Sequence, residues 1–312
     1  MAWKPQRPIE IVAGTPPGGG LDRSARALQN AIVANGLVDV AVNVVNVGGE
    51  GGRKAWRHIE GSPGDGHVIG ISSPNMLADY LMGVTASDPA RFAPLAILYS
   101  EYIAFVVRAE AAIRSGADLI GCFAGGVRNV RIALSTSLGN SNHVAVAKVI
   151  RDAGGDAGGD AGAADIRVFD TALDAVADVV AGHADIGAIT AASAVDALDA
   201  RRLRAIGVSS PARLAGPYAG VPTWTEQGVD CVVGSWRGVS GPPGLGEGEI
   251  AFWQTMLAAA TRSSHWGLDL ERLFWTEMYL DGARLREYLE RERTDMRRVL
   301  GELGLLAGAG GG

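Results

Sequence analysis

Residues 15–22, Thr-Pro-Pro-Gly-Gly-Gly-Leu-Asp, are the residue types best suited to hold an anion. Three successive glycines, Gly18, Gly19 and Gly20, allow backbone conformations closed to other residues and bring N–H groups close to a ligand. At the N-terminus of a helix such N–H groups favour an anion, because the helix dipole adds to them. Asp22 could cap the helix or orient a water molecule. The pattern predicts an anion-binding loop, although the same glycines could simply form a tight turn.

The residues that follow the glycines exclude two better-known glycine loops. A phosphate-binding P-loop ends in Gly-Lys-Ser/Thr, whereas Gly20 is followed by Leu21 and Asp22. The dinucleotide fingerprint requires its last glycine where Arg23 stands. Neither nucleotide motif is therefore present in this loop.

The elements that must position the loop are a strand before it and a helix after it. Residues 9–12 alternate apolar and polar, which is typical of a half-buried strand. Leu21, Ala25, Leu28 and Ile32 recur at helical spacing, so a helix should start near Leu21. The unit is predicted to be strand, glycine-rich turn, helix.

The same order recurs in the middle of the chain. Residues 130–134 are predicted as a strand, and the small polar loop after it contains Ser137, Gly139, Asn140 and Ser141 before another helix. A third strand, 68–72, is followed by Ser73 and Asn75. Solutes bind outside the carboxyl ends of strands in open α/β sheets, so these polar residues are candidate ligand contacts.

The string from Ile11 to Arg26 resembles the first motif of the Bug family, the solute receptors of tripartite tricarboxylate transporters. The usual form of this motif is an apolar strand, Pro-Phe-x-Pro-Gly-Gly-x-x-Asp and then Ala-Arg. In that family the loop holds a carboxylate of the solute through backbone N–H groups and waters. Here Gly14 and Thr15 replace the usual Pro-Phe, which alters the wall of the expected pocket.

Later segments extend the resemblance and also depart from it. Gly139 and His143 match a second motif, Gly-x-Gly-Ser-x-x-His, in which Asn140 replaces the serine. The turn that begins at Thr190 matches the family's Asp-Asn-x-Pro-Ser only at Ser193. The resemblance and the strand ends together predict these ligand contacts: Thr15, Gly18, Gly19, Gly20, Asp22, Ser73, Asn75, Ser137, Gly139, Asn140, Ser141, Thr190 and Ser193.

Alternating strands and helices predict an α/β protein. The resemblance spans residues 8–306 and implies the two-lobed fold of type II periplasmic-binding proteins. Residues 1–106 and 235–312 are expected to form lobe 1, and residues 107–234 lobe 2, with two crossover segments as the hinge. Trp236, near the second crossover, could be either a wall of the binding cleft or a core residue.

The resemblance also implies a function. The protein should capture a small carboxylate between its two lobes and deliver it to the integral-membrane subunits of a tripartite transporter. It should be a periplasmic monomer that performs no catalysis and needs no cofactor. Two alternatives stay open, namely an α/β enzyme that acts on a small anionic substrate and a ligand-sensing partner of a signalling system.

Composition excludes some classes of protein. The 312 residues carry a net charge of −6 with no basic block, which argues against nucleic-acid binding. The first five residues lack the apolar core of a signal peptide, so the chain is expected to be either cytoplasmic or a trimmed mature form, and an exported family favours trimming. The five histidines include no His-x-x-x-His pair, and no Gly-x-Ser-x-Gly elbow occurs, so neither a metal nor a catalytic serine is expected.

Four further expectations concern structure alone. Residues 95–98 and 103–107 should form two separate strands. Ala-Gly-Gly-Asp occurs twice within residues 152–164 and predicts a flexible surface loop, and the tail 307–312 should be disordered. Cys122 and Cys231 are expected to be buried free thiols rather than a disulfide.

Overall fold

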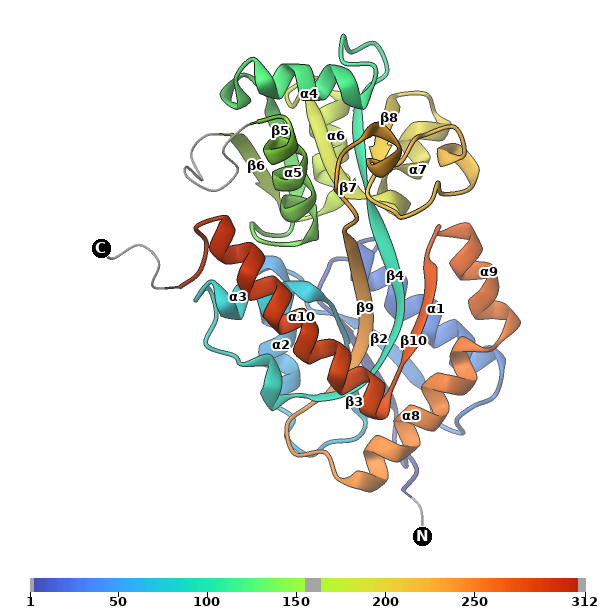
Figure 1. Cartoon of the computed structure of the whole chain (residues 1–312). Helices are drawn as coiled ribbons and strands as arrows, with labels where there is room; N and C mark the ends of the chain where they lie inside the picture. The colour runs from blue at the N-terminus through green and yellow to red at the C-terminus, as the bar shows by residue number, and fades with distance from the viewer. Residues whose placement is uncertain (1–2, 155–163, 308–312) are drawn as a thin grey trace. The chain divides into compact units, whose positions relative to one another are not determined.

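A computed structural model of the chain describes residues 3–154 and 164–307 (Figure 1). These residues form two compact units. Unit 1 runs to Tyr80 and also contains Val84–Ser100 and Trp236–Asp295, and unit 2 contains Leu81–Gly83, the described part of Glu101–Ser235, and the residues from Met296. The boundaries of lobes 1 and 2 stay a prediction. The Ala-Gly-Gly-Asp repeat and the tail lie largely outside the described residues.

Unit 1 is built on a mixed sheet in the order β2-β1-β3-β9-β4, with β10 paired to β4. Strand β1 pairs in parallel with both β2 and β3, so these three strands end at one edge, whereas β9 runs antiparallel to β3. The strands are β1 (Ile9–Ala13), β2 (Val42–Asn46), β3 (Val68–Ser72), β4 (Ala93–Arg108), β9 (Gly234–Gly241) and β10 (Thr276–Leu280). The α-helices are α1 (Gly20–Ala34), α2 (Arg53–Glu60), α3 (Pro74–Leu81), α8 (Glu247–Thr261), α9 (Ser264–Arg272) and α10 (Gly282–Glu302), and the 3-10 turns are η1 (Glu50–Gly52) and η2 (Pro89–Arg91).

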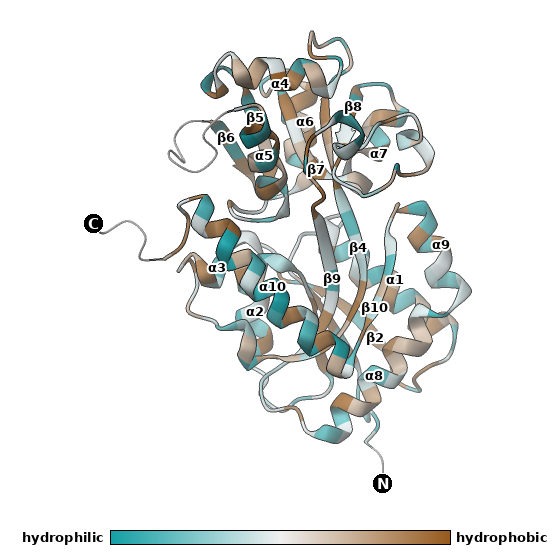
Figure 2. Cartoon of the chain, viewed as in Figure 1, coloured by the Kyte–Doolittle hydropathy of each residue, from teal (hydrophilic) through white to brown (hydrophobic). Residues whose placement is uncertain are grey.

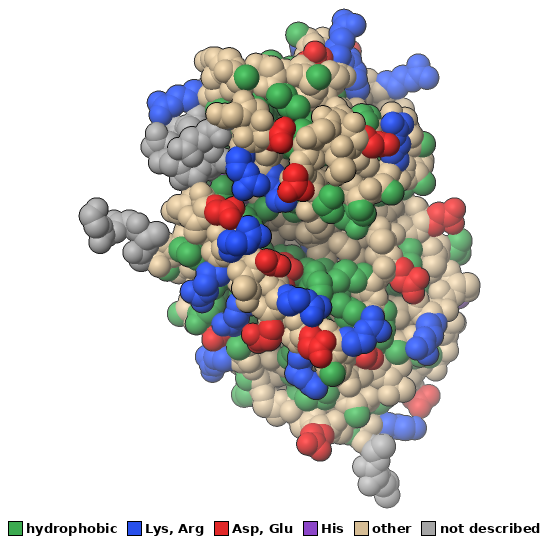
Figure 3. Space-filling model, viewed as in Figure 1, with side chains coloured by type: hydrophobic (Ala, Val, Ile, Leu, Met, Phe, Trp, Pro, Cys, Tyr) green, Lys and Arg blue, Asp and Glu red, His purple; other side chains and the backbone are tan. Residues whose placement is uncertain are grey.

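Two groups of helices cover this sheet. Helix α1 packs against α8 and α9, while α2, α3 and α10 lie on the other side of the sheet (Figure 1). Hydrophilic and hydrophobic stretches alternate along α10 (Figure 2), and basic and acidic side chains are mixed on its outer surface (Figure 3). Helix α10 is therefore amphipathic, and its apolar side packs on the sheet through Leu285, which contacts Ile97 and Trp236.

Unit 2 repeats the α/β plan. Strand β5 lies between β6 and β7 and is parallel to both, and the second half of β4 pairs with β7 and β8. The strands are β5 (Arg131–Ser135), β6 (Asp165–Phe169), β7 (Ile186–Thr190) and β8 (Leu203–Val208). The α-helices are α4 (Gly116–Ala124), α5 (Ser141–Asp152), α6 (Ala172–Val180) and α7 (Ala191–Asp199), with 3-10 turns η3 (Val127–Asn129), η4 (Gly216–Tyr218) and η5 (Thr225–Gln227).

The long strand β4 corrects one prediction. Residues 95–98 and 103–107 are parts of one strand, which begins in unit 1 and ends in unit 2. The residues between them include Tyr99, Ser100 and Glu101, which are all more than nine-tenths buried. The Tyr99 hydroxyl bonds to Ser24 Oγ, Glu101 also has a polar or ionic partner, and Ser100 is paired with Thr276 of β10, so the strand continues through these residues.

Three side chains with uncertain roles are now placed. Trp236 is 7% exposed and packs on Ile97 and Leu285, so it is a core residue that also lines a pocket described below. Both cysteines are free thiols; Cys231 is buried, as expected, but Cys122 is exposed, which corrects the prediction that both are buried.

Among the described helices, none combines the length and the apolar composition needed to cross a membrane.

Candidate functional site

The glycine loop of unit 1 uses two of its backbone donors internally. The Gly18 N–H donates to Asp22 Oδ2 (2.8 Å) and the Gly19 N–H donates to the Pro16 carbonyl (3.0 Å). Gly18 adopts a left-handed conformation (φ +83°), which other residues rarely do, and Gly19 approaches the Thr15 side chain too closely for a Cβ atom. These two glycines therefore shape the loop rather than offer their own N–H groups.

Asp22 holds the loop from within. Its side chain is 2% exposed and accepts further hydrogen bonds from Asn46 Nδ2 (2.8 Å) and Arg26 Nε (3.0 Å). Burial acts to raise the pKa of Asp22, but the hydrogen bonds from Arg26, Asn46 and Gly18 and the charge of Arg26 keep that pKa below its ordinary value. Asp22 lies three positions after the N-cap of α1, which is Gly19, so it braces the turn before the helix and is not the N-cap residue.

Two backbone donors at the start of α1 remain available to a ligand. The N–H groups of Gly20 and Leu21, the first two of the helix, have no hydrogen-bond partner in the part of the chain that the structure describes. The next N–H, that of Asp22, donates to Thr15 Oγ1 (3.1 Å). Two adjacent free N–H groups at a helix start can receive the two oxygens of one carboxylate.

Ser73 and Asn75 follow β3 at the same edge of the sheet at which the glycine loop follows β1. Strands β1 and β3 are parallel neighbours, with Val12 opposite Gly70, so the chain leaves both strands on the same side. Ser73 is 6% exposed and Asn75, in the first turn of α3, is half-buried. The topology thus gathers the predicted contacts of unit 1 at one sheet edge, and their roles stay a prediction.

The loop of unit 2 is braced by a neutral side chain. Asn140 is the N-cap of α5 and accepts a hydrogen bond from the His143 N–H (3.0 Å). Its amide nitrogen donates to the Ser135 carbonyl (2.6 Å) and to Thr136 Oγ1 (2.8 Å). Asn140 is 2% exposed, so all three bonds are shielded from water. The residue that departs from the family's motif therefore closes this turn.

His143 completes the brace in unit 2. Its Nδ1 accepts a hydrogen bond from the Gly139 N–H (3.0 Å), which requires an imidazole that is unprotonated at that atom. Burial lowers the pKa of His143 to about 4, so the ring is neutral near pH 7. Gly139 has φ +74°. His143 is thus a structural residue of the loop.

The start of α5 offers the same pair of donors as the start of α1. The N–H groups of Ser141 and Asn142 have no partner among the residues described, and the Ser141 hydroxyl donates to the Gly234 carbonyl (3.3 Å). The Ser137 hydroxyl is buried and is also without a hydrogen-bond partner in the described chain. The two loops therefore share one construction: a parallel strand, a braced turn and two unpaired N–H groups.

Thr190 and Ser193 are placed beside the loop of unit 2 by the sheet. Strands β5 and β7 are parallel neighbours, so Thr190, the last residue of β7, follows the same edge as the 136–140 turn. Thr190 Oγ1 and Ser193 Oγ lie 2.9 Å apart and bond to each other. Both side chains are more than nine-tenths buried, and whether they contact a ligand stays a prediction.

The sequence did not indicate four of the residues that build these loops. Leu21 and Asn142 supply backbone donors, which any residue type can do, so their side chains carry no signal. Asn46 and Arg26 hold Asp22 through contacts between segments, which their residue types and spacing do not indicate. No cluster of three or more His, Cys, Asp or Glu side chains that could hold a metal ion occurs in the described ranges.

The chain was compared with protein-family models, with curated proteins and with solved structures. No protein-family model matches the chain. A curated relative, a UPF0065 protein from the tcbD-tcbE intergenic region of Pseudomonas sp. (strain P51), is 28% identical over 246 residues, which are 77% of this chain and 69% of that protein.

Two solved structures share the fold. A Rhodopseudomonas palustris protein, Rpa4515 with adipate, superposes with a TM-score of 0.86 at 20% identity and covers 96% of this chain and 98% of that chain. The periplasmic binding protein BugD has a TM-score of 0.82 at 18% identity and covers 97% and 99%. The α/β fold is therefore that of periplasmic binding proteins, and the sequence and fold together confirm the resemblance of this chain to the Bug family of solute-binding proteins.

Proposed function

We propose that this protein is a periplasmic receptor that binds a small carboxylate and delivers it, as a monomer, to the integral-membrane subunits of a tripartite transporter. The observation that carries the proposal is the pair of unpaired N–H groups at Gly20 and Leu21, in a loop that also matches the first motif of the Bug family. The adipate in the Rhodopseudomonas palustris protein and the name of BugD as a periplasmic binding protein support the ligand class and the location.

The charge distribution around the loop favours backbone donors over a cationic clamp. The two nearby arginines are engaged within the loop: Arg26 bonds to Asp22, and Arg23 Nη1 donates to the Gly18 carbonyl (2.8 Å). A hydrogen bond to a charged group contributes about 1.5–3 kcal/mol, so Gly20 and Leu21 together could contribute about 3–6 kcal/mol to binding. We expect the selectivity for a carboxylate to come from the geometry of these two donors.

The proposal excludes catalysis, and two observations favour that over an enzyme. His143, a candidate for a general base, already accepts the Gly139 N–H at Nδ1, and burial lowers its pKa to about 4, which makes it a weak base. The Asp22 carboxylate accepts three hydrogen bonds from the loop, so it is not poised to take a proton. A ligand-sensing role would use the same binding site, and only a transport assay separates it from delivery to a transporter.

The variant Gly20→Pro tests whether the backbone N–H of residue 20 contributes to binding. Proline removes the N–H but suits the first position of a helix, and Gly19 before it has the extended conformation (φ −71°, ψ 168°) that a following proline needs. Gly20→Ala is the matched control, because it keeps the N–H and its Cβ would meet no atom within 4 Å. We expect Gly20→Pro to weaken adipate binding about tenfold or more in calorimetry, and Gly20→Ala to bind within about threefold of the parent.

A tenfold loss in both variants would mean that the loop conformation, not the N–H, governs binding. Native mass spectrometry identifies any small carboxylate that co-purifies with the parent protein. The proposal would be contradicted if the protein bound neither that carboxylate nor adipate nor succinate. Adipate affinity should also change little between low and moderate ionic strength, since long-range attraction between charges is screened by salt whereas short donor contacts are not. Uptake of the labelled solute in the native host, with and without this gene, then tests delivery.

A further inference from the structure

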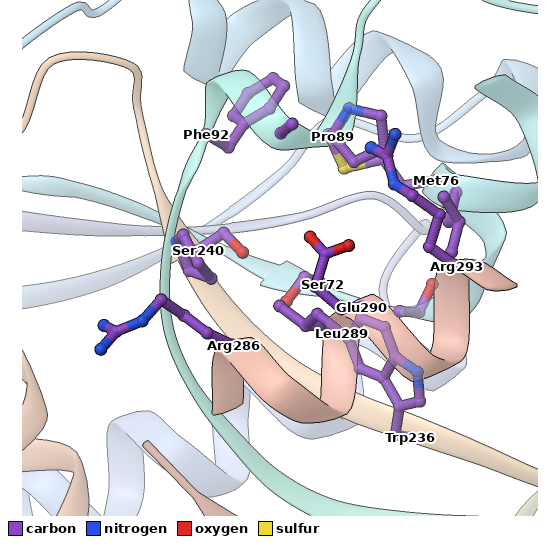
Figure 4. Close-up of a pocket in the computed structure, with 14 residues that line it drawn as sticks. Ser72, Met76, Pro89, Phe92, Trp236, Ser240, Arg286, Leu289, Glu290 and Arg293 are labelled. Carbon is purple, nitrogen blue, oxygen red and sulfur yellow. The ribbon is translucent and has the colours of Figure 1, made fainter. Parts of the chain in front are cut away.

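Unit 1 contains a pocket of about 360 Å³ that the glycine loop does not line. Its floor is formed by β3 and β9, and its sides by α3, the segment around η2, and α10 (Figure 4). This is the side of the sheet that faces α10, whereas α1 packs against α8 and α9. The volume lies within the range of small-molecule sites, about 300–1,000 Å³.

The pocket exists because small residues occupy a face of the sheet that would otherwise carry large ones. Trp236, Gly238 and Ser240 alternate along β9 and therefore share one face. Gly238 lies opposite Ser72 in the antiparallel β3–β9 pair, and a Cβ at Gly238 would lie 2.6 Å from the Ala96 carbonyl oxygen. Serine and glycine under a helix leave space that leucine or isoleucine would fill.

Three serine hydroxyls line this space without a protein partner. Ser72, Ser73 and Ser240 are 5%, 6% and 9% exposed, and none of their hydroxyls has a hydrogen-bond partner among the residues described. Figure 4 shows Ser72 and Ser240 on the pocket floor. These hydroxyls are therefore available to a polar group of a ligand.

The remaining walls are apolar and aromatic. Met76, Phe92, Trp236 and Leu289 line the pocket from four different elements. Met76 and Phe92 also belong to the core cluster under α2, and Trp236 packs on Leu285 of α10, so these walls are fixed by core packing. A flat apolar body of about the size of a benzene ring would contact side chains on several sides.

The charges at the pocket are not all neutralised. Arg293 Nη2 bonds to Asp88 Oδ1 (3.2 Å), so this cation is already paired. Arg286 and Glu290, one turn apart on α10, have no ion-pair partner in the described part of the chain. Arg286 can pair with one carboxylate, whereas Glu290, whose carboxylate points into the pocket (Figure 4), repels an anion there. The charges thus favour a monoanion over a dianion.

We propose that this pocket is a second small-molecule site, separate from the carboxylate loop, and that it binds an aromatic monocarboxylate. The ring lies against Trp236, Phe92 and Met76, the carboxylate is paired with Arg286, and the serine hydroxyls bond to polar atoms of the ligand. The site does not depend on the proposed transport function, because its lining excludes Gly20 and Leu21 and shares only Ser73 with the predicted carboxylate contacts.

Benzoate is the probe, and benzyl alcohol, with the same ring but no charge, is its control. By the size of the ligand we expect a Kd of about 0.1–1 mM for benzoate, measured by calorimetry and by shifts of the Met76 methyl and Trp236 indole signals in NMR spectra. Arg286→Gln should weaken benzoate binding about two- to fivefold, since the arginine is exposed. The matched control Arg291→Gln, an exposed arginine of α10 that does not line the pocket, should have no effect.

Ser240→Leu fills the pocket from its floor and should abolish benzoate binding while adipate binding persists, which also shows that the variant is folded. Gly20→Pro should have the opposite effect. Benzoate that fails to bind the parent protein, or that binds Ser240→Leu and Arg286→Gln as tightly as the parent, would overturn the proposal. It would also be wrong if adipate displaced benzoate competitively or if benzyl alcohol bound as tightly as benzoate. Binding of benzoate without binding of adipate would leave this site standing and contradict the carboxylate loop.

Discussion

Replacement of Asp22 by asparagine or alanine separates its charge from its role as an acceptor. The carboxylate is 2% exposed and accepts hydrogen bonds from the Gly18 N–H, Asn46 Nδ2 and Arg26 Nε at 2.8–3.0 Å. Alanine leaves the Gly18 N–H without an acceptor in a partly buried site and takes one of two acceptors from Asn46 Nδ2, which keeps the Thr15 carbonyl. The loss of a hydrogen-bond partner costs about 1–3 kcal/mol. Asparagine keeps one acceptor oxygen but turns an NH₂ group toward a donor. We expect a loss of unfolding free energy of about 2–4 kcal/mol for Asp22→Ala and about 1–2 kcal/mol for Asp22→Asn.

The role of Asp22 also predicts how the stability of the protein depends on pH. Burial acts to raise the pKa of Asp22, yet the hydrogen bonds and the Arg26 charge lower it below the ordinary value of 3.8. Because the folded-state pKa is depressed, the unfolded state binds more protons, and the stability contributed by Asp22 is present above about pH 4 and lost as the pH falls below 3.8. Asp22→Asn should remove this part of the acid sensitivity.

Urea unfolding at pH 7 and at several values down to pH 3 measures both effects, and calorimetry with adipate measures the consequence for the loop. The control is Asp39→Asn, which changes an exposed carboxylate of unit 1 and should behave as the parent protein. Adipate affinity should fall less in Asp22→Asn than in Asp22→Ala. Equal stability of the parent and both Asp22 variants, with unchanged acid sensitivity, would refute the claim that Asp22 braces the loop.

Three other predictions concern the remaining buried polar groups. Asn140→Ala should lower the unfolding free energy by about 1–3 kcal/mol in urea titrations, whereas Asn140→Ser, which can still cap α5, should cost less. Burial lowers the pKa of His143 from 6.5 to about 4, so the unfolded state binds a proton that the folded state does not. The unfolding free energy should therefore fall by at most about 3 kcal/mol as the pH drops from 6.5 to about 4. His143→Gln should remove this pH dependence, and NMR titration of the ring measures the pKa. Arg53 Nη1 pairs with the buried Asp79 (2.9 Å), so Arg53→Met should cost about 3 kcal/mol and a second change, Asp79→Asn, should restore most of it in the same unfolding assay.

The sequence predicted the strand, turn and helix around the glycines correctly but not the hydrogen bonds of the loop. The strand at residues 9–12 and the helix from Leu21 agree with β1 and α1, because alternation and helical spacing are local signals. The fate of each N–H is not a local signal. Gly18 and Gly19 donate within the turn only because Gly18 takes a left-handed conformation that brings the Asp22 carboxylate to it, and no spacing rule indicates that.

Long-range pairing explains what the sequence could not show elsewhere. Residues 95–98 and 103–107 are predicted as two strands, because the burial of Tyr99, Ser100 and Glu101 between them depends on neighbours that are distant in the sequence. Ser240 lies opposite Gly70 only through the antiparallel pairing of β9 with β3. The pocket beneath α10 is therefore invisible in the linear order of the residues.

The two loops offer the same pair of helix N–H groups, but they are braced by groups of different charge. In unit 1 the brace is the ionised Asp22, whose charge is balanced by Arg26, and in unit 2 it is Asn140 with the neutral His143. A carboxylate that bound at the first loop would therefore approach a fixed negative charge that is compensated within the loop, whereas one at the second loop would meet no charged brace. Loss of Arg26 would expose the Asp22 charge to a bound anion, while a change at Asn140 alters only the shape of the turn. The same arrangement of backbone donors is thus sensitive to charge in one unit and to packing in the other.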